Sequence, residues 1–442
     1  MVFEHCTPCH RPGQQSPLPL LDYQDVRNRT GQIVVSMRRR TMPPWLPEPG
    51  FNEFLEAKLL HPDQIAMFRQ WVEDGIPEGA PEPPPTPIFS DRWQLGEPDV
   101  VVRAPQPYTL KTGDAEVVRN LVIPVPVTST RYVRAMEFHP DNSKILRHAI
   151  IGIDHTPRAR TLDARDGEPG YPGMLFDHIE SPRDRLSVWV PGSAPWVEPD
   201  GMAWRLQPGS DLVIQLQLRP TGAAESIQPS IALFFSSTPP VRDPVLIKLE
   251  STMIDIPAGS RDHTVIDSYV LPVGLQVLSV YPHAHTLAKR MRATATLPDG
   301  TMTWLLWIKE WDSHWAEQYR YARPVDLPRG TTLKMEFVYD NSDANMRNPH
   351  YPPRRVRWGV QPTDEMGILW LHVLPHNEAD ADILLKDYQR GRQRAGDGRG
   401  RKHNALVGAG PMVRRLFDAL LPMTDFVMRS SVTRRLSCHA AC

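Results

Sequence analysis

Proline is the residue type that most restricts what this chain can fold into. The sequence holds 47 prolines among 442 residues, about twice the usual share of roughly 5%. A proline inside a helix removes a backbone hydrogen bond and clashes with the preceding turn, whereas strand edges and loops tolerate it. Long helices are therefore disfavoured, and we expect a mainly β fold.

Short apolar and β-branched runs between about residue 88 and residue 376 support that expectation. Turn residues separate runs such as NLVIPVPV, KILRHAIIGID, DLVIQLQLRP, LQVLSVYPHAH and EMGILWLHVL. The Pro-Asp-Gly sequence at 298–300 is typical of a hairpin turn between two of them. Many short strands at this spacing favour antiparallel β-sandwiches. Because the region is long for one sandwich, we predict two in tandem, with the division near residue 240.

The whole chain is expected to divide into parts that differ in amino-acid composition and in predicted secondary structure. These are a small helical unit at 1–76, a proline-rich linker at 77–88, a first β-sandwich at 89–240, a second at 241–380 and a basic, disordered tail at 381–442. In the first part, Ile65, Phe68 and Val72 follow helical spacing, which predicts a helix between Pro62 and Gly75. In the tail, VRRLFDALLPMTDFVM is compatible with one amphipathic helix.

Charge and composition argue against several classes of protein. Basic and acidic side chains nearly cancel, which leaves a net charge of -1, so no strong field favours nucleic acid or an anionic membrane surface. The sequence contains no apolar run near the roughly 20 residues of a membrane helix and no signal peptide. Its four cysteines lie at positions 6, 9, 438 and 442, so no disulfide joins the long middle of the chain.

The first cysteine pair belongs to a pattern with a specific chemistry. The stretch C-T-P-C-H, from Cys6 to His10, matches the C-x-x-C-H signature of covalent c-type haem attachment. In that arrangement Cys6 and Cys9 bond to the haem vinyl groups, and the His10 imidazole becomes an axial iron ligand. The alternative is a thiol redox pair, which would favour a βαβ context that the sequence lacks.

A second axial ligand of haem is usually a methionine or another histidine. Met42, in R-T-M-P-P-W, is the natural candidate because Pro43 and Pro44 would stiffen the loop that aims it, and Met37 is the alternative. A lone methionine is also a common filler of hydrophobic cores. The sequence therefore predicts a small c-type cytochrome unit with His10 and Met42 as the preferred ligand pair.

A second metal-ligand pattern occurs late in the chain. His283 and His285 end a strand-like run, and residues at i and i+2 of a strand point to the same face. Alone, an H-x-H pair is more often an ordinary surface pair than a metal site. Met366 in T-D-E-M changes that balance, because two imidazoles and a thioether suit a copper ion that passes through Cu(I). An open coordination position would leave room for dioxygen.

Taken together, these stretches resemble a known family, the copper type II, ascorbate-dependent monooxygenases, the class of peptidylglycine α-hydroxylating monooxygenase. More closely, the chain resembles bacterial members fused behind a c-type cytochrome. The matching stretches span roughly residues 4 to 380: CTPCHRPG, MPPW, FSDRWQLGEPDVV, PGYPG, PHAHTLAKRM, ATLPDGT, WIKEWD, FVYDNSDAN and QPTDEM. The resemblance implies two jelly-roll-like β-sandwich subdomains with one copper each. The second would hold the dioxygen-activating copper through His283, His285 and Met366.

The first subdomain departs from the family pattern, which places an electron-relay copper on three histidines. Arg147 stands where the first of them is expected, and only His148 of that pair remains. Gln217 stands at the third position, and Arg219 replaces a nearby histidine. Arginine has no lone pair to donate, and an amide oxygen is a poor ligand for Cu(I). We therefore expect this copper site to be weakened or lost.

Two other histidines lie in the same stretch of sequence. His139 and His155 flank the run that contains His148. They are alternative ligands for the first copper, although each is more simply an ordinary surface histidine.

These observations predict a copper-dependent oxidoreductase that uses dioxygen to hydroxylate a C–H bond of a small-molecule or peptide substrate. The haem at His10 would serve as an electron donor. The alternative is a non-hydroxylating electron-transfer or copper-binding relative. We expect no nucleic-acid partner and no membrane span.

Haem attachment and the family resemblance imply a periplasmic or otherwise extracytoplasmic protein. Because no leader precedes the haem motif, we expect upstream sequence to be missing, and the tail ending in SCHAAC is equally unusual. In WIKEWDSHW, Trp307, Trp311 and Trp315 could line a cleft, although sandwich core is the more ordinary role.

Overall fold

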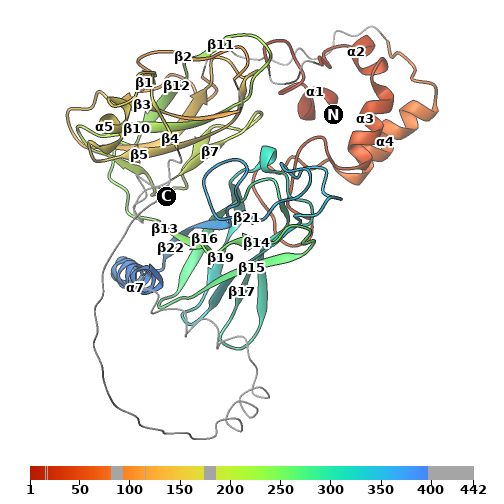
Figure 1. Cartoon of the computed structure of the whole chain (residues 1–442). Helices are drawn as coiled ribbons and strands as arrows, with labels where there is room; N and C mark the ends of the chain where they lie inside the picture. The colour runs from red at the N-terminus through yellow and green to blue at the C-terminus, as the bar shows by residue number, and fades with distance from the viewer. Residues whose placement is uncertain (15, 17, 81–92, 115, 174–185, 397–442) are drawn as a thin grey trace, which may run out of the picture. The chain divides into compact units, whose positions relative to one another are not determined.

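The structure, a computed structural model, describes residues 1–396 except 15, 17, 81–92, 115 and 174–185 (Figure 1). Most of the predicted linker, the predicted helix near the C-terminus, and Cys438 and Cys442 lie outside the described residues. Contacts between Cα atoms group Met1–Tyr388 into one compact unit and Gln389–Cys442 into another. Within the described parts of the chain, no helix is long and apolar enough to cross a membrane.

The N-terminal segment is helical, as predicted. Its helices are α1 (Val2–His5), α2 (Tyr23–Arg27), α3 (Thr30–Arg38) and α4 (Pro62–Glu73). Helix α4 confirms the helix expected between Pro62 and Gly75. His61 and Gln64 form a reciprocal capping box at its start, and Gly75 follows its end with φ +88°, a conformation that favours glycine. Its Phe68 is buried.

The rest of the compact unit Met1–Tyr388, called unit 1 below, is mainly β, which confirms the broad fold class. A first β region contains β1 (Val100–Arg103), β2 (Tyr108–Leu110), β3 (Val117–Pro124), β4 (Arg131–His139), β5 (Leu146–Asp154), α5 (Arg158–Asp163), β6 (Tyr171–Pro172), β7 (Ser187–Trp189), β8 (Trp196–Val197), β9 (Trp204–Leu206), β10 (Asp211–Leu218), β11 (Glu225–Ile227) and β12 (Ser230–Phe235). Its larger antiparallel sheets have the orders β6-β3-β10-β5-β7 and β1-β12-β4-β8, and β9 also pairs with β4. One hydrophobic cluster takes side chains from both, including Leu121 and Ile214 from one sheet and Val133 and Ile231 from the other.

A second β region follows after residue 244. It contains β13 (Val245–Glu250), β14 (Asp255–Ile256), β15 (His263–Val270), β16 (Leu275–His283), β17 (Ala288–Thr296), β18 (Met302–Ile308), the 3-10 turn η1 (Ser313–Trp315), β19 (Tyr319–Leu327), β20 (Thr332–Tyr339), β21 (Val356–Arg357) and β22 (Ile368–Pro375). Its larger sheets have the orders β13-β22-β16-β19 and β15-β20-β17-β18, again antiparallel. Val277 and Leu371 from one sheet share a hydrophobic cluster with Ala293 and Phe337 from the other.

The predicted hairpin turn at 298–300 joins β17 to β18. The backbone N–H of Leu297 donates to the carbonyl of Thr301 at 2.8 Å, and the N–H of Gly300 donates to that of Leu297 at 2.9 Å. Gly300 has φ +89°, in the left-handed region where glycine has no steric penalty. The Pro-Asp-Gly signal therefore marked a real turn.

The expectation of disorder from residue 381 onward is wrong for its first part. Helix α7 spans Glu378–Gly396 and lies beside β13 and β22 (Figure 1). Its buried residues follow i, i+3, i+4, i+7 spacing: Ala381, Leu384, Leu385 and Tyr388. The Tyr388 hydroxyl donates to the carbonyl of Lys248 in β13 at 3.1 Å and accepts its N–H at 2.9 Å. An apolar stripe thus holds this helix despite the charged composition around it.

Residues 47–55, after the N-terminal helices α1–α3, run along strands of the second β region. The N–H of Glu48 donates to the carbonyl of Trp307 at 2.8 Å, and the N–H of Leu55 donates to that of Arg320 at 2.8 Å. Pro47 and Phe54 form isolated bridges with Ile308 and Tyr321. Backbone pairing therefore ties this segment to β18 and β19.

The shared core predicts a large difference between two neighbouring substitutions. Phe337 in β20 is fully buried, whereas Ile266 in the adjacent β15 is 54% exposed. Phe337→Ala should lower the free energy of unfolding by about 3–5 kcal/mol through lost contacts and a cavity. Ile266→Ala should change it by less than about 0.5 kcal/mol. Urea unfolding of both variants checks this, and equal shifts would contradict the placement of Phe337 in the core.

Candidate functional site

The structure brings His283 and His285 together. His283 is the last residue of β16 and pairs with Ile368 of β22, and His285 follows two residues later. Their ring centroids lie 5.5 Å apart with an interplanar angle of 89°. His283 is 7% exposed, and its ring lies 6.2 Å from that of Trp370. The pair is therefore embedded in the second β region and is not an ordinary surface pair.

Both imidazoles are held neutral. Burial lowers the pKa of His283 well below its usual value, and His285 and His148 lower it further. Burial also lowers the pKa of His285, against a rise caused by its bond to Asp364. Nδ1 of His285 lies 3.0 Å from the Asp364 carbonyl oxygen, which only accepts, so Nδ1 carries the proton and Nε2 keeps its lone pair. A backbone carbonyl that accepts the N–H of the other ring nitrogen orients many metal-binding histidines.

Met366 is joined to the histidine segment through one buried carboxylate. Oε2 of Glu365 accepts the backbone N–H of His285 at 2.9 Å and that of Met366 at 3.1 Å. Oε1 accepts the N–H of Leu287 at 2.6 Å. The Tyr339 hydroxyl donates to the Met366 carbonyl at 2.7 Å. Met366 is 2% exposed, so its side chain is buried, and these hydrogen bonds hold its backbone beside the histidine segment.

Glu365 and Trp311 are site residues that sequence reasoning missed or left aside. Glu365 is fully buried, and burial raises its pKa to about 8 against the opposing effect of four backbone N–H groups. Trp311 is 1% exposed and donates its indole N–H to the His285 carbonyl at 3.1 Å. The only sequence signal for Glu365 was its place next to Met366.

The positions expected to hold the first copper are occupied by a polar network. His148 in β5 lies opposite Gln217 in β10. Arg147 Nε lies 3.3 Å from Oε1 of Glu116, and the Gln217 amide donates to the same oxygen. His148 is 5% exposed, and burial, followed by Arg147 and His314, lowers its pKa to about 4. Glu116 thus links Arg147 and Gln217, the residues at the two positions where the resemblance led us to expect histidine.

The alternative histidines do not converge on His148. His139 stacks on Trp93 with centroids 3.8 Å apart and bonds to Oε1 of Glu137 at 3.0 Å. His155 lies beyond the far end of β5 and bonds to Ser210 at 2.9 Å. A strand rises about 3.3 Å per residue, which separates positions 148 and 155 by about 23 Å.

Across the described residues, no three His, Cys, Asp or Glu side chains are grouped so that they could hold a metal ion. The candidate set at His283 and His285 therefore depends on a methionine for its third ligand.

The residues of the haem motif line one cavity of about 650 Å³. Cys6, Cys9, His10 and both methionine candidates, Met37 and Met42, are on its wall. The two cysteines are free thiols, and burial raises the pKa of both, that of Cys6 to about 11. Vinyl attachment would consume these thiols.

The His10 ring also has a defined orientation. Its Nδ1 lies 2.9 Å from the Leu18 carbonyl oxygen and 2.9 Å from the Ser16 hydroxyl. The carbonyl only accepts, so Nδ1 carries the proton and Nε2 offers the lone pair that an axial ligand needs.

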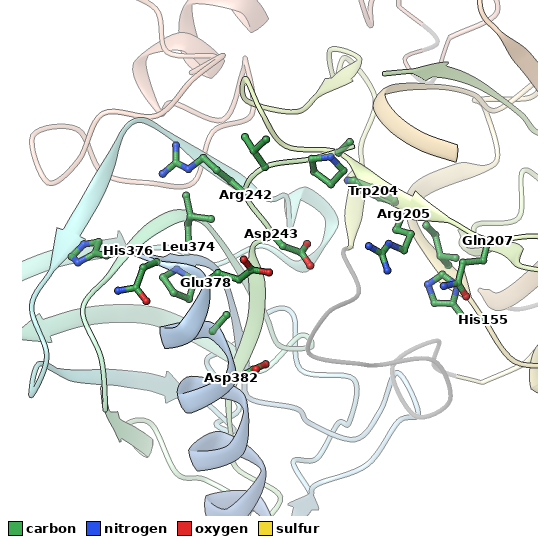
Figure 2. Close-up of a pocket in the computed structure, with 17 residues that line it drawn as sticks. His155, Trp204, Arg205, Gln207, Arg242, Asp243, Leu374, His376, Glu378 and Asp382 are labelled. Atoms are coloured by element: carbon green, nitrogen blue, oxygen red, sulfur yellow. The ribbon is translucent and has the colours of Figure 1, made fainter. Parts of the chain in front are cut away.

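A larger cavity of about 860 Å³ lies elsewhere in unit 1 (Figure 2). Its wall is strongly charged, with Arg205, Arg242, Asp243 and Glu378 among the residues that line it. Of the histidines considered above, only His155 reaches it. The cavity therefore belongs to neither candidate site.

Comparisons with known proteins leave the family open. No family model matches the chain, and no curated protein matches it. Among solved structures, it is similar to the subviral particle of VP2 from infectious bursal disease virus, with 11% identity over 64% of this chain and 74% of that one and a TM-score of 0.20. A second is the T13 particle of the same virus, with 11% identity over 63% and 69% and a TM-score of 0.17. Likenesses at these scores carry no argument about fold or function.

The Glu365 network predicts the effect of a nearly isosteric change. Glu365→Gln replaces one acceptor oxygen by an NH₂ group that faces backbone donors. It should lower the free energy of unfolding by roughly 1–3 kcal/mol. Glu336→Gln, at an exposed ion pair with Arg292, should cost less than about 1 kcal/mol. Thermal unfolding of the two variants is the measurement, and an equal or larger loss in Glu336→Gln would contradict this role.

Proposed function

We propose that this chain is a copper-dependent monooxygenase-like oxidoreductase with a fused c-type haem. The observation that carries the proposal is the pair of neutral imidazoles at His283, which is buried, and His285, which is half-buried, in a segment that Glu365 links to the backbone of Met366. This donor set agrees with the resemblance to the peptidylglycine α-hydroxylating monooxygenase class. In the same proposal the two β regions are jelly-roll-like sandwiches, a view supported by hydrophobic clusters that each draw on two antiparallel sheets.

The side chains at the second site fit copper by their chemistry. Neutral imidazole and thioether sulfur are ligands that Cu(I) accepts and that harder divalent ions disfavour. Bound there, copper would supply the one-electron chemistry that reduces dioxygen and hydroxylates a C–H bond. Asp364 fixes the tautomer of His285, and Tyr339 and Glu365 fix the backbone of Met366. Burial of His283 and Met366 limits the access of bulk water to their ligand atoms.

The N-terminal cavity fits a covalently attached haem. Cys6 and Cys9 are free thiols on its wall, and His10 presents Nε2 while Leu18 holds its Nδ1 proton. A haem there would store and deliver one electron at a time. We propose Met42 as the second axial ligand, with Met37 on the same wall as the alternative. An extracytoplasmic location and a small-molecule or peptide substrate belong to the same proposal.

A second candidate function is a non-hydroxylating electron-transfer or copper-binding protein. The network of Glu116, Arg147 and Gln217 favours it, because Arg147 and Gln217 stand where the family pattern places two relay histidines and Glu116 bonds to both. Restoring histidine at both positions discriminates between the candidates. A gain of oxygen uptake in the restored variant would show that the relay had decayed. Unchanged uptake, already present in the parent protein, would favour the haem as electron donor.

The direct test of the proposed activity is oxygen consumption by the haem-loaded, copper-loaded full chain. After reduction with ascorbate, we expect oxygen uptake that depends on an added peptide or small-molecule substrate and disappears in His283→Ala. If a broad panel of such substrates and reductants gave no uptake with copper bound, the second candidate function would stand instead.

Copper binding predicts a pattern among histidine variants. His283→Ala and His285→Ala should each weaken Cu(I) binding by more than the roughly 10- to 100-fold that outer-shell changes cause. His263→Ala, which removes a half-buried histidine from β15 of the same region, should bind as the parent does. Competition titration with a Cu(I) chelator measures all three. Unweakened binding in both site variants would contradict the assignment.

The axial-ligand proposal predicts different effects of substituting Met42 and Met37, which lie on the same cavity wall. Met42→Ala should abolish the thioether-to-iron absorption of the oxidised haem protein and lower its reduction potential, because methionine ligation raises the potential of c-type haem. Met37→Ala should leave both properties close to those of the parent. Visible and near-infrared spectroscopy with redox titration checks the pair, and the reverse pattern would assign Met37.

A further inference from the structure

Residues of the first β region form part of the haem cavity. Arg147 at the start of β5 and Arg219 just after β10 lie on the same cavity wall as Cys9 and His10. The Arg219 guanidinium also donates through Nε to the carbonyl of Lys144 at 3.2 Å, which ties it to the turn just before β5. The haem-attachment motif and the two arginines come from distant parts of the sequence and line the same cavity.

The charge of this wall is one-sided. Arg29 joins Arg147 and Arg219 on it, and among the described residues no aspartate or glutamate lines the cavity. Glu116 forms an ion pair with Arg147 but is not among the residues that line the cavity. Arg147 and Arg219 both line the cavity, and the pKa of Arg219 is lowered by burial and by the charge of Arg147, against an opposing effect of Glu116. Such a wall suits an anionic ligand group.

A second contact joins the first β region to the attachment motif. A Cβ atom added to Gly192, in the loop after β7, would lie 3.1 Å from the Cys9 sulfur. Gly192 has φ +83°, so both its conformation and its neighbour favour glycine. The Ser143 hydroxyl, just before β5, donates to the carbonyl of Gly13 at 2.9 Å. The first β region therefore packs on the haem motif through several independent residues.

We propose that Arg147 and Arg219 bind the propionate carboxylates of the haem, so that the first β region completes the haem site. This inference rests on the proposed haem attachment at Cys6 and Cys9. A guanidinium binds a carboxylate through two parallel hydrogen bonds, which a histidine cannot provide. In this proposal the arginine at position 147 is an anion-binding residue for haem at a place where the family pattern has a relay-copper ligand.

The test uses the full chain with covalently attached haem. Arg147→Gln/Arg219→Gln should lower the haem reduction potential, because removing positive charge near the iron favours the ferric state. Glu116→Gln should raise it, since it removes the negative partner of Arg147. Arg290→Gln, at an ion pair with Asp262 in the second β region, is the matched control and should leave the potential unchanged. Resonance Raman spectra should show a shifted propionate-bending band in the double variant and not in Arg290→Gln.

The outcomes separate this inference from the proposal beneath it. A parent protein that attaches no haem overturns both. A haem-loaded parent whose double variant keeps its potential, or shifts potential without a change in the propionate band, overturns only the arginine assignment. Arg219→Gln alone, which leaves the Glu116–Arg147 pair intact, should lower the potential by a smaller amount. If the double variant does not fold, the reduction potential of Arg219→Gln tests whether the arginines bind the propionates.

Discussion

The hydrogen bonds accepted by the buried Glu365 carboxyl group are the interaction on which the candidate copper site depends. This group accepts backbone N–H groups from His285 and Leu287 on one side and from Met366 on the other. Without Glu365, each of those N–H groups would lack a hydrogen-bond acceptor inside the protein. A buried N–H without an acceptor costs more folding free energy than an exposed N–H, which can bond to water. A fully buried acid is itself unfavourable unless such donors surround it. The network therefore holds together the two segments that carry all of the proposed copper ligands.

Strand pairing sets the frame in which Glu365 acts. The antiparallel register of β16 and β22 places His283 opposite Ile368, so the residues just beyond that pair, His285 and Met366, leave the sheet at the same end. Trp311 closes this end from a third segment by bonding to the His285 carbonyl. The segments that carry the candidate copper ligands are about 80 positions apart along the chain. They lie side by side because β16 and β22 are neighbouring strands that end at the same edge.

Local features of the sequence predicted local structure well. The stripe at Ile65, Phe68 and Val72 gave α4, and the Pro-Asp-Gly sequence gave the turn between β17 and β18. Helix α7 was missed because its apolar stripe is set among many charged residues, and its stability comes from packing on the second β region. Glu365 was missed for a related reason: its partners His285 and Leu287 lie 80 and 78 positions away, and only the folded chain shows them.

The first β region connects the two candidate centres. Its β5 carries Arg147 on the wall of the haem cavity and, one residue later, the buried His148, which contributes to lowering the pKa of His283. Adjacent residues of one strand thus face the proposed haem cavity and influence a histidine of the proposed copper site.

X-ray absorption spectroscopy of the Cu(I)-loaded full chain tests the central claim most directly. The account predicts a copper shell with two imidazole nitrogens and one thioether sulfur, and loss of that sulfur in Met366→Ala. A parent protein whose bound copper shows no sulfur neighbour would contradict it.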